Sequence, residues 1–133
     1  MPSLVVDTHA IIWYLANDAR LSAPAADALD SASRDGGLIY VPSICLVELT
    51  YLVEKGRLPS IARKRLVQAL DDPSVACQLA PLDRIVADAL EWIDRQEIPD
   101  LPDRVIAATA IALRVALISR DGKIRASKVQ TIW

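Results

Sequence analysis

Four carboxylates in this chain stand at positions where acidic side chains could take part in chemistry: Asp7, Glu48, Asp103 and Asp121. Two of them follow short apolar runs, and a third lies in the first turn of a long apolar segment. Glu48 is the only charged residue in the ten-residue stretch from Ile44 to Val53, where it interrupts an apolar helical face. That stretch predicts a buried helix, and a buried carboxylate is costly unless a partner compensates its charge.

Each acid taken alone has a simpler explanation. Asp7 is a typical N-cap for a following helix, and Asp103 could face the dipole at the start of one. Asp121 with Gly122 is a common turn signal, and Glu48 could pair with a buried Arg. The functional interpretation rests on the set, because three acids fall at strand or helix ends on one expected edge of a sheet.

A convergent set of carboxylates would require a cation. Two carboxylates ~4 Å apart repel by about 4 kcal/mol at an effective dielectric near 20, so four of them could not all stay ionised unaided. Oxygen ligands without Cys, and with one His at most, favour Mg²⁺ or Mn²⁺ over zinc. Such an ion activates a bound water and neutralises a phosphodiester in its transition state. The set therefore predicts phosphodiester hydrolysis.

Short apolar runs alternate with segments of helical periodicity along the chain. We expect strands at residues 4–6, 38–41, 75–79, 116–119 and 129–132. We expect helices at residues 10–15, 22–33, 44–55, 60–70, 83–95 and 102–114. Strands separated by helices predict an α/β fold with a parallel sheet and helices on both faces. Ligands bind beyond the carboxyl ends of such strands, which is where Asp7 and Asp121 would lie.

Composition fits one globular domain over residues 1–133. The chain is 53% hydrophobic and 24% charged, which excludes a wholly disordered protein. It contains no Phe, so its core must consist mainly of Leu, Ile, Val and Ala. The net charge of −2 gives no bulk signal of nucleic-acid binding, although the total leaves a local basic patch open.

Cysteine usage and hydropathy predict a cytoplasmic protein without membrane association. Cys45 and Cys77 form no zinc or CxxC pattern and lie among apolar neighbours, so we expect both side chains to be buried in the core. Free cysteines also indicate a reducing compartment. The N-terminus lacks the basic and apolar regions of a signal peptide. The longest uncharged apolar stretch, 105–113, is far shorter than the ~20 residues that span a bilayer.

The order of the acidic segments resembles a known family. The segments that carry the resemblance are Val6–His9, Val47–Leu49, Pro102–Ala110 and Ile118–Asp121. In order and spacing they are similar to the four acidic motifs of PIN-domain ribonucleases, and the resemblance covers essentially the whole chain. The length and the Asp7-Thr8-His9 opening look most like VapC toxins of bacterial toxin–antitoxin pairs.

The resemblance implies a three-layer α/β/α sandwich with a central parallel sheet. It implies an acidic pocket for Mg²⁺ or Mn²⁺, cleavage of single-stranded RNA, a homodimer, and inhibition by a cognate VapB-like antitoxin. It assigns the catalytic, metal-holding role by motif position to Asp7, Glu48, Asp103 and Asp121. Ser119 stands where the family often has Thr, and Asp100 lies close enough in sequence to support the site from outside.

Several other residues have both a functional and a structural interpretation. His9, the single histidine, and Thr8 are expected to support the site or the local structure. The basic group Arg57 with 63–65 is either a solvated helix face or a patch that follows an RNA backbone. Arg104 and Arg120 flank two site acids and either position phosphates or balance charge. The three tryptophans, at positions 13, 92 and 133, are expected in the core or in a dimer contact.

Two non-nuclease alternatives stay open at the level of sequence. A doubly wound phospho-acceptor domain would also place Asp residues and Mg²⁺ beyond strand ends, with Lys123 near its late strand, but it would not explain Glu48. A PIN-like fold could also bind a metal and a partner without turnover. Incubation with a small phosphodonor and an RNA cleavage assay distinguish these cases.

Overall fold

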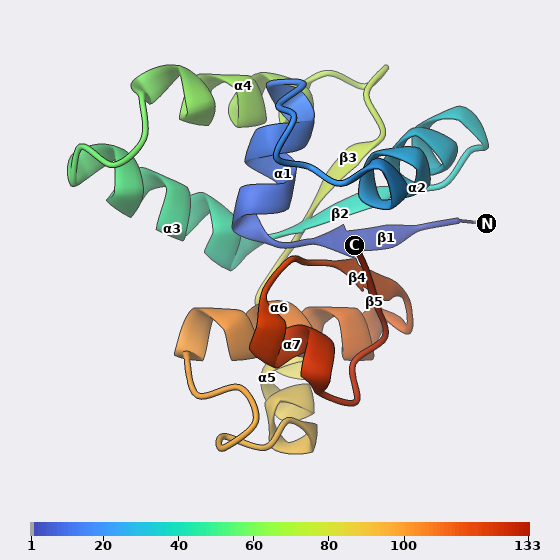
Figure 1. The fold of residues 1–133 in the computed structure, drawn as a ribbon, viewed down its shortest axis with the longest axis vertical. Coiled ribbons are helices and arrows are strands. Elements are labelled where there is room, and N and C mark those ends of the chain that lie inside the picture. The colour runs from blue at the N-terminus through green and yellow to red at the C-terminus, as the bar shows by residue number, and fades with distance from the viewer. Residues whose placement is uncertain (1) are drawn as a thin grey trace.

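A five-stranded parallel sheet forms the centre of the molecule in the computed structural model, which describes residues 2–133 (Figure 1). The strand order is β3-β2-β1-β4-β5. The strands are β1 (Leu4–Val6), β2 (Ile39–Pro42), β3 (Cys77–Ala80), β4 (Ala116–Ile118) and β5 (Thr131–Ile132). β1 is buried along its whole length, as expected for a central strand covered on both faces.

Helices cover both faces of this sheet (Figure 1). Those on one side are α1 (Thr8–Leu15), α2 (Ala23–Arg34), α3 (Ser43–Glu54) and α4 (Ser60–Asp71). Those on the other side are α5 (Arg84–Ala89), α6 (Leu101–Leu113) and α7 (Gly122–Ala126), with a short 3₁₀ turn, η1 (Leu90–Trp92), after α5. This three-layer α/β/α arrangement confirms the predicted fold class.

The strand order reverses beside β1, and this reversal determines where a ligand can bind. The chain runs outward from β1 to β2 and β3, then returns to the opposite side of β1 as β4. In the β1–β4 pair Val6 lies opposite Ile118, so Asp7 and Ser119 leave the sheet as neighbours. In open α/β sheets the crevice beyond such a switch point is the usual ligand site.

The core is aliphatic, as the absence of Phe requires. It is built around fully buried side chains that include Val5, Ile11, Leu29, Ile106 and Leu117. The two cysteines, Cys45 and Cys77, are buried and free, which confirms that prediction. Within residues 2–133 the helices are all too short or too polar to cross a bilayer.

The predicted helix over 83–95 is wrong in its second half. α5 ends at Ala89, η1 follows, and Ile93 is extended with φ −109° and ψ 115°. The Arg104 guanidinium donates through Nη2 to the carbonyls of Leu90 and Ile93, at 3.3 and 3.1 Å. A tertiary contact thus satisfies carbonyls that a longer helix would have used, and periodicity along the sequence does not reveal such a contact.

Two other predictions need correction. α7 begins at Gly122, where Asp121 and Gly122 had predicted only a turn. The expected burial of α3 is also wrong, because only Cys45 and Leu49 are fully buried there. Val47 and Tyr51 are 62% and 54% exposed, so the apolar residues of α3 continue onto its solvent face.

Candidate active site

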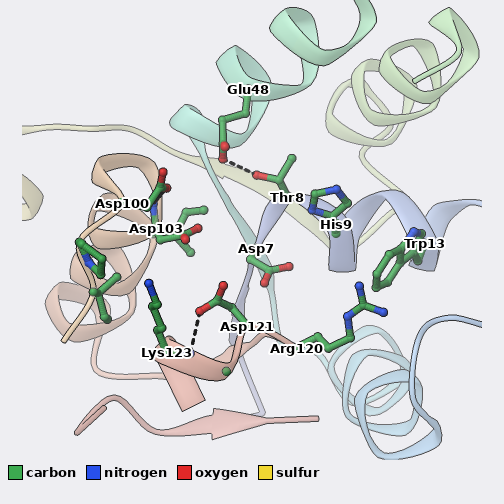
Figure 2. Close-up of a pocket in the computed structure, with 14 residues that line it drawn as sticks. Asp7, Thr8, His9, Trp13, Glu48, Asp100, Asp103, Arg120, Asp121 and Lys123 are labelled. Carbon is green, nitrogen blue, oxygen red and sulfur yellow. Dashed lines mark hydrogen bonds between the residues drawn. The ribbon is translucent and has the colours of Figure 1, made fainter. Parts of the chain in front are cut away.

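A pocket of about 680 Å³ opens beyond the carboxyl ends of β1 and β4, and it is lined by acidic side chains (Figure 2). The four acids singled out in the sequence all line it, together with a fifth: Asp7, Glu48, Asp100, Asp103 and Asp121. They come from four different regions of the chain and both helical layers. The convergence predicted from their positions at strand and helix ends is therefore present.

Asp7 connects β1 to α1 and performs two tasks. Its Oδ1 accepts a hydrogen bond from the Ala10 backbone N–H at 2.9 Å, so it is the N-cap of α1. Burial raises the pKa of the Asp7 carboxyl above its ordinary value, while hydrogen bonds from the Ser119 hydroxyl and the Ala10 N–H partly oppose that rise. Asp7 therefore caps α1 and also lines the pocket.

Asp121 and Asp100 repeat this arrangement at two further helix starts. Asp121 Oδ1 accepts from the backbone N–H groups of Lys123 and Ile124, each at 3.0 Å, and caps α7 (Figure 2). Asp100 Oδ2 accepts from the Asp103 N–H at 3.1 Å and caps α6. Three helix N-termini therefore face the pocket, where their partial positive charge favours anionic side chains.

Glu48 enters the pocket from α3 and is held by a hydroxyl rather than by a cation. The Thr8 Oγ1 donates to Glu48 Oε1 at 2.7 Å, and Thr8 itself is only 4% exposed. Among residues 2–133 no Lys or Arg forms an ion pair with Glu48, so the buried Arg expected as an alternative is absent. Burial raises the pKa of Glu48, and the Thr8 hydrogen bond limits the rise.

The pKa of Asp103 is strongly raised. This residue lies in the first turn of α6, and burial raises its pKa to about 7. Repulsion from Asp100, Asp121, Glu48 and Asp7 adds to this rise, in that order. A carboxyl that titrates near neutrality in a pocket is typical of a functional site.

The donor set suits a hard divalent cation. The pocket offers carboxylate oxygens and no thiolate, which matches the preference of Mg²⁺ and Mn²⁺ for oxygen. In the described part of the chain, no three His, Cys, Asp or Glu side chains are close enough together to form a ready-made metal cluster. Mg²⁺ keeps several waters and needs only one or two direct carboxylates, so an open set of this kind is compatible with it.

Comparison with known proteins agrees with this geometry. A sequence model of the PIN domain matches residues 4–129. The chain belongs to the PIN-domain family. It is also 28% identical over 138 residues, and over the full length of both chains, to a Mycobacterium tuberculosis protein named Ribonuclease VapC22. The resemblance inferred from the four acidic motifs is thus confirmed.

Solved structures support the same fold. VapBC2 from Rickettsia felis, bound to a DNA fragment from its promoter, superimposes with a TM-score of 0.69 at 18% identity, covering 96% of each chain. A toxin–antitoxin complex from Klebsiella pneumoniae gives a TM-score of 0.68 at 23% identity, covering 98% of this chain and 97% of that one. At these identities the likeness concerns the fold.

The cationic and aromatic residues of this PIN domain separate into two groups. His9, Trp13, Arg120 and Lys123 line the acidic pocket. Sequence reasoning did not place Trp13 or Lys123 there. The signal for Trp13 is its position one helical turn after His9, since the two rings lie 5.5 Å apart between centroids.

The remaining basic residues lie elsewhere. Arg104 does not line the pocket, because its guanidinium is turned toward backbone carbonyls at the end of η1. The basic group at 63–65 is on the exposed face of α4, outside the pocket. There Arg63 Nε donates to Thr50 Oγ1 at 3.0 Å, which links α4 to α3.

Proposed function

We propose that this PIN domain is a Mg²⁺-dependent endoribonuclease that hydrolyses phosphodiester bonds of RNA as the toxin of a toxin–antitoxin pair. The observation that carries the proposal is the pocket of five carboxylates at the switch point of the sheet. The name of the M. tuberculosis relative and the toxin–antitoxin complexes among the structural neighbours support it. Mn²⁺ could replace Mg²⁺, because both accept an oxygen-only ligand set.

The metal-holding residues in this proposal are Asp7, Glu48, Asp103 and Asp121. When bound, the ion supplies Lewis acidity and an activated water for attack on phosphorus. The helix-start hydrogen bonds fix the carboxylates of Asp7 and Asp121, and the Thr8 hydroxyl fixes that of Glu48. Asp103, whose pKa burial raises to about 7, is a carboxyl suited to hold a proton near neutral pH.

The test compares charge removal inside and outside the pocket. Asp7→Asn and Asp103→Asn should retain the fold, because amides replace carboxylates of the same shape, but lose Mg²⁺-dependent cleavage of single-stranded RNA and growth arrest on induction. Asp83→Asn is the matched control: Asp83 caps α5 through the Val86 N–H at 3.0 Å, as Asp7 caps α1, but lies outside the pocket. Parental cleavage rates in both pocket variants would refute the proposal.

The same assay tests the alternative of a metal-binding domain without nuclease activity. That alternative predicts intact RNA in the presence of Mg²⁺ together with Mg²⁺-dependent stabilisation of the parental protein. A phospho-acceptor of this class would also become labelled on Asp by a small phosphodonor. RNA breakage that disappears in Asp103→Asn excludes both.

We further propose that residues 1–133 act as one domain, in the cytoplasm, as a homodimer inhibited by a VapB-like antitoxin. The exposed side chains Val47 and Tyr51 lie one helical turn apart on α3 and offer an apolar surface that supports contact with a partner protein. Light scattering should give twice the mass of one chain, and co-expression with the antitoxin should abolish cleavage. A monomer at micromolar concentration would refute the dimer.

A further inference from the structure

Arg120 stands at the edge of the acidic pocket with an uncommitted guanidinium. It lines the pocket and immediately precedes Asp121, yet within residues 2–133 it makes no hydrogen bond and no ion pair. Its side chain is exposed. A guanidinium has five N–H donors in a planar fork, so Arg120 presents donors that the fold does not use.

Trp13 explains why Arg120 does not fold onto the neighbouring carboxylates. The Arg120 Cζ lies 4.7 Å from the centroid of the Trp13 ring, at cation–π distance (Figure 2). Trp13 is only 4% exposed, and its ring lies near those of His9 and Trp133, at centroid distances of 5.5 and 6.0 Å. A buried ring thus provides a fixed platform for an exposed cation.

A second arginine, Arg20, also lies over the Trp13 ring but differs from Arg120 in having a carboxylate partner. The Arg20 Cζ is 5.1 Å from the Trp13 centroid, but Arg20 Nη2 is paired with Asp18 Oδ2 at 2.8 Å and does not line the pocket. Arg20 is therefore neutralised, whereas Arg120 is not. Arg104, the other arginine next to a site acid, donates hydrogen bonds through Nη2 to two backbone carbonyls. Arg120 is the arginine of the pocket that can receive an anion.

We propose that Arg120, positioned by Trp13, binds a backbone phosphate of the RNA next to the phosphate that is cleaved. This inference rests on the proposed function, because it takes RNA as the substrate. The pocket then has an acidic wall that holds the cation and a cationic edge that holds the neighbouring phosphate. Arginine suits the second task, because its fork matches two phosphate oxygens at once.

The test measures RNA binding and cleavage separately. Binding of a labelled single-stranded RNA is followed by fluorescence anisotropy with Ca²⁺ in place of Mg²⁺, at several salt concentrations. Arg120→Ala should weaken binding about tenfold and reduce the slope of log K against log salt by about 0.7, the value for one lost contact on a single strand. Arg20→Ala, the matched control, should leave both unchanged.

Single-turnover cleavage in Mg²⁺ supplies the second measurement. Arg120→Ala should raise the protein concentration at half-maximal rate about tenfold and leave the maximal rate within about threefold of the parental value. Arg120→Lys should recover part of the binding and the full salt slope, because it keeps the charge and loses the fork. An unchanged affinity in Arg120→Ala, or a loss confined to the maximal rate, would overturn the assignment.

Trp13 acts through Arg120 and needs its own test. Trp13→Phe should weaken binding about threefold with the salt slope unchanged, and should have no further effect when combined with Arg120→Ala. Additive losses would show that Trp13 has only a structural role. If the parental protein binds this RNA but leaves it intact in Mg²⁺, the proposed nuclease function fails, and the anisotropy series still decides whether Arg120 binds phosphate.

Discussion

Replacing Asp103 by Asn should make the metal-free protein more stable while it abolishes cleavage. The pKa of Asp103 is raised from 3.8 to about 7, mainly by burial and then by the surrounding acids. Each pKa unit corresponds to about 1.4 kcal/mol, so the whole shift sets an upper limit of about 4 kcal/mol. The side chain is only partly buried and its charge is shared with coupled neighbours, so we expect about 1–2 kcal/mol.

The direction of the pH dependence follows from proton binding. Because the pKa is higher in the folded state, the folded protein binds more protons than the unfolded chain between pH 4 and 7. The parental protein therefore loses stability as the pH rises through this range, and the loss is complete above it. Asp103→Asn does not carry this carboxyl, so its advantage should be absent near pH 4 and greatest above pH 7.

Thermal unfolding in EDTA between pH 4 and pH 8 measures this advantage. For a chain of this length, 1–2 kcal/mol corresponds to roughly 4–8 °C in Tm at pH 7.5. Asp83→Asn should shift Tm by less than about 2 °C, because Asp83 is exposed and Asn also caps a helix. A metal-free Asp103→Asn that is less stable than the parental protein at pH 7.5 would refute the repulsion argument.

Three further predictions concern the metal, Glu48 and Arg104. EDTA should abolish cleavage, and Mg²⁺ or Mn²⁺ should restore it. In calorimetry, Mg²⁺ at 100 times its Kd should stabilise the parental protein by about 2.7 kcal/mol and should stabilise Asp103→Asn much less. Thr8→Val removes the hydrogen bond that limits the pKa of Glu48, so more of this carboxyl is protonated at low pH. The cleavage rate should therefore fall several-fold, and fall further at pH 6 than at pH 8. An equal loss at the two pH values would contradict this role of Thr8. Arg104→Met should lower the free energy of unfolding by about 1–3 kcal/mol, because the Ile93 carbonyl loses its donor, while the Leu90 carbonyl keeps only the Ile93 N–H. Urea titration at the parental m-value checks this.

The central part of the fold and the four acids follow from the sequence for one physical reason. Parallel strands are short apolar runs with polar residues at their carboxyl ends, and in a sheet those ends lie at one edge. Pairing of β1 with β4 therefore brings Asp7 beside Ser119, and Asp121 follows two residues later at the same pocket. Glu48 was identifiable because a lone charge in an apolar helix requires a compensating partner.

The features that sequence reasoning missed depend on tertiary contacts. Beyond the end of α5, the Leu90 carbonyl accepts a hydrogen bond from Arg104, which lies 14 residues further along the chain. The exposure of Val47 and Tyr51 reflects how much of α3 the sheet and its neighbours cover, and an apolar sequence does not encode that coverage. Asp121 and Gly122 are compatible with a turn or with a capped helix, and the choice depends on the burial of Ile124.

Capping by the acids compensates only a small part of the negative charge in the pocket. A helix N-terminus stabilises a nearby carboxylate by about 0.3–1 kcal/mol, and three such helix ends face this pocket. Two carboxylates repel by about 2 kcal/mol even when ~7 Å apart, and five carboxylates form many such pairs. The three helix N-termini together therefore offset the repulsion of about one pair of carboxylates. The remaining charge must be protonated, as the pKa of Asp103 near 7 indicates, or matched by a divalent ion.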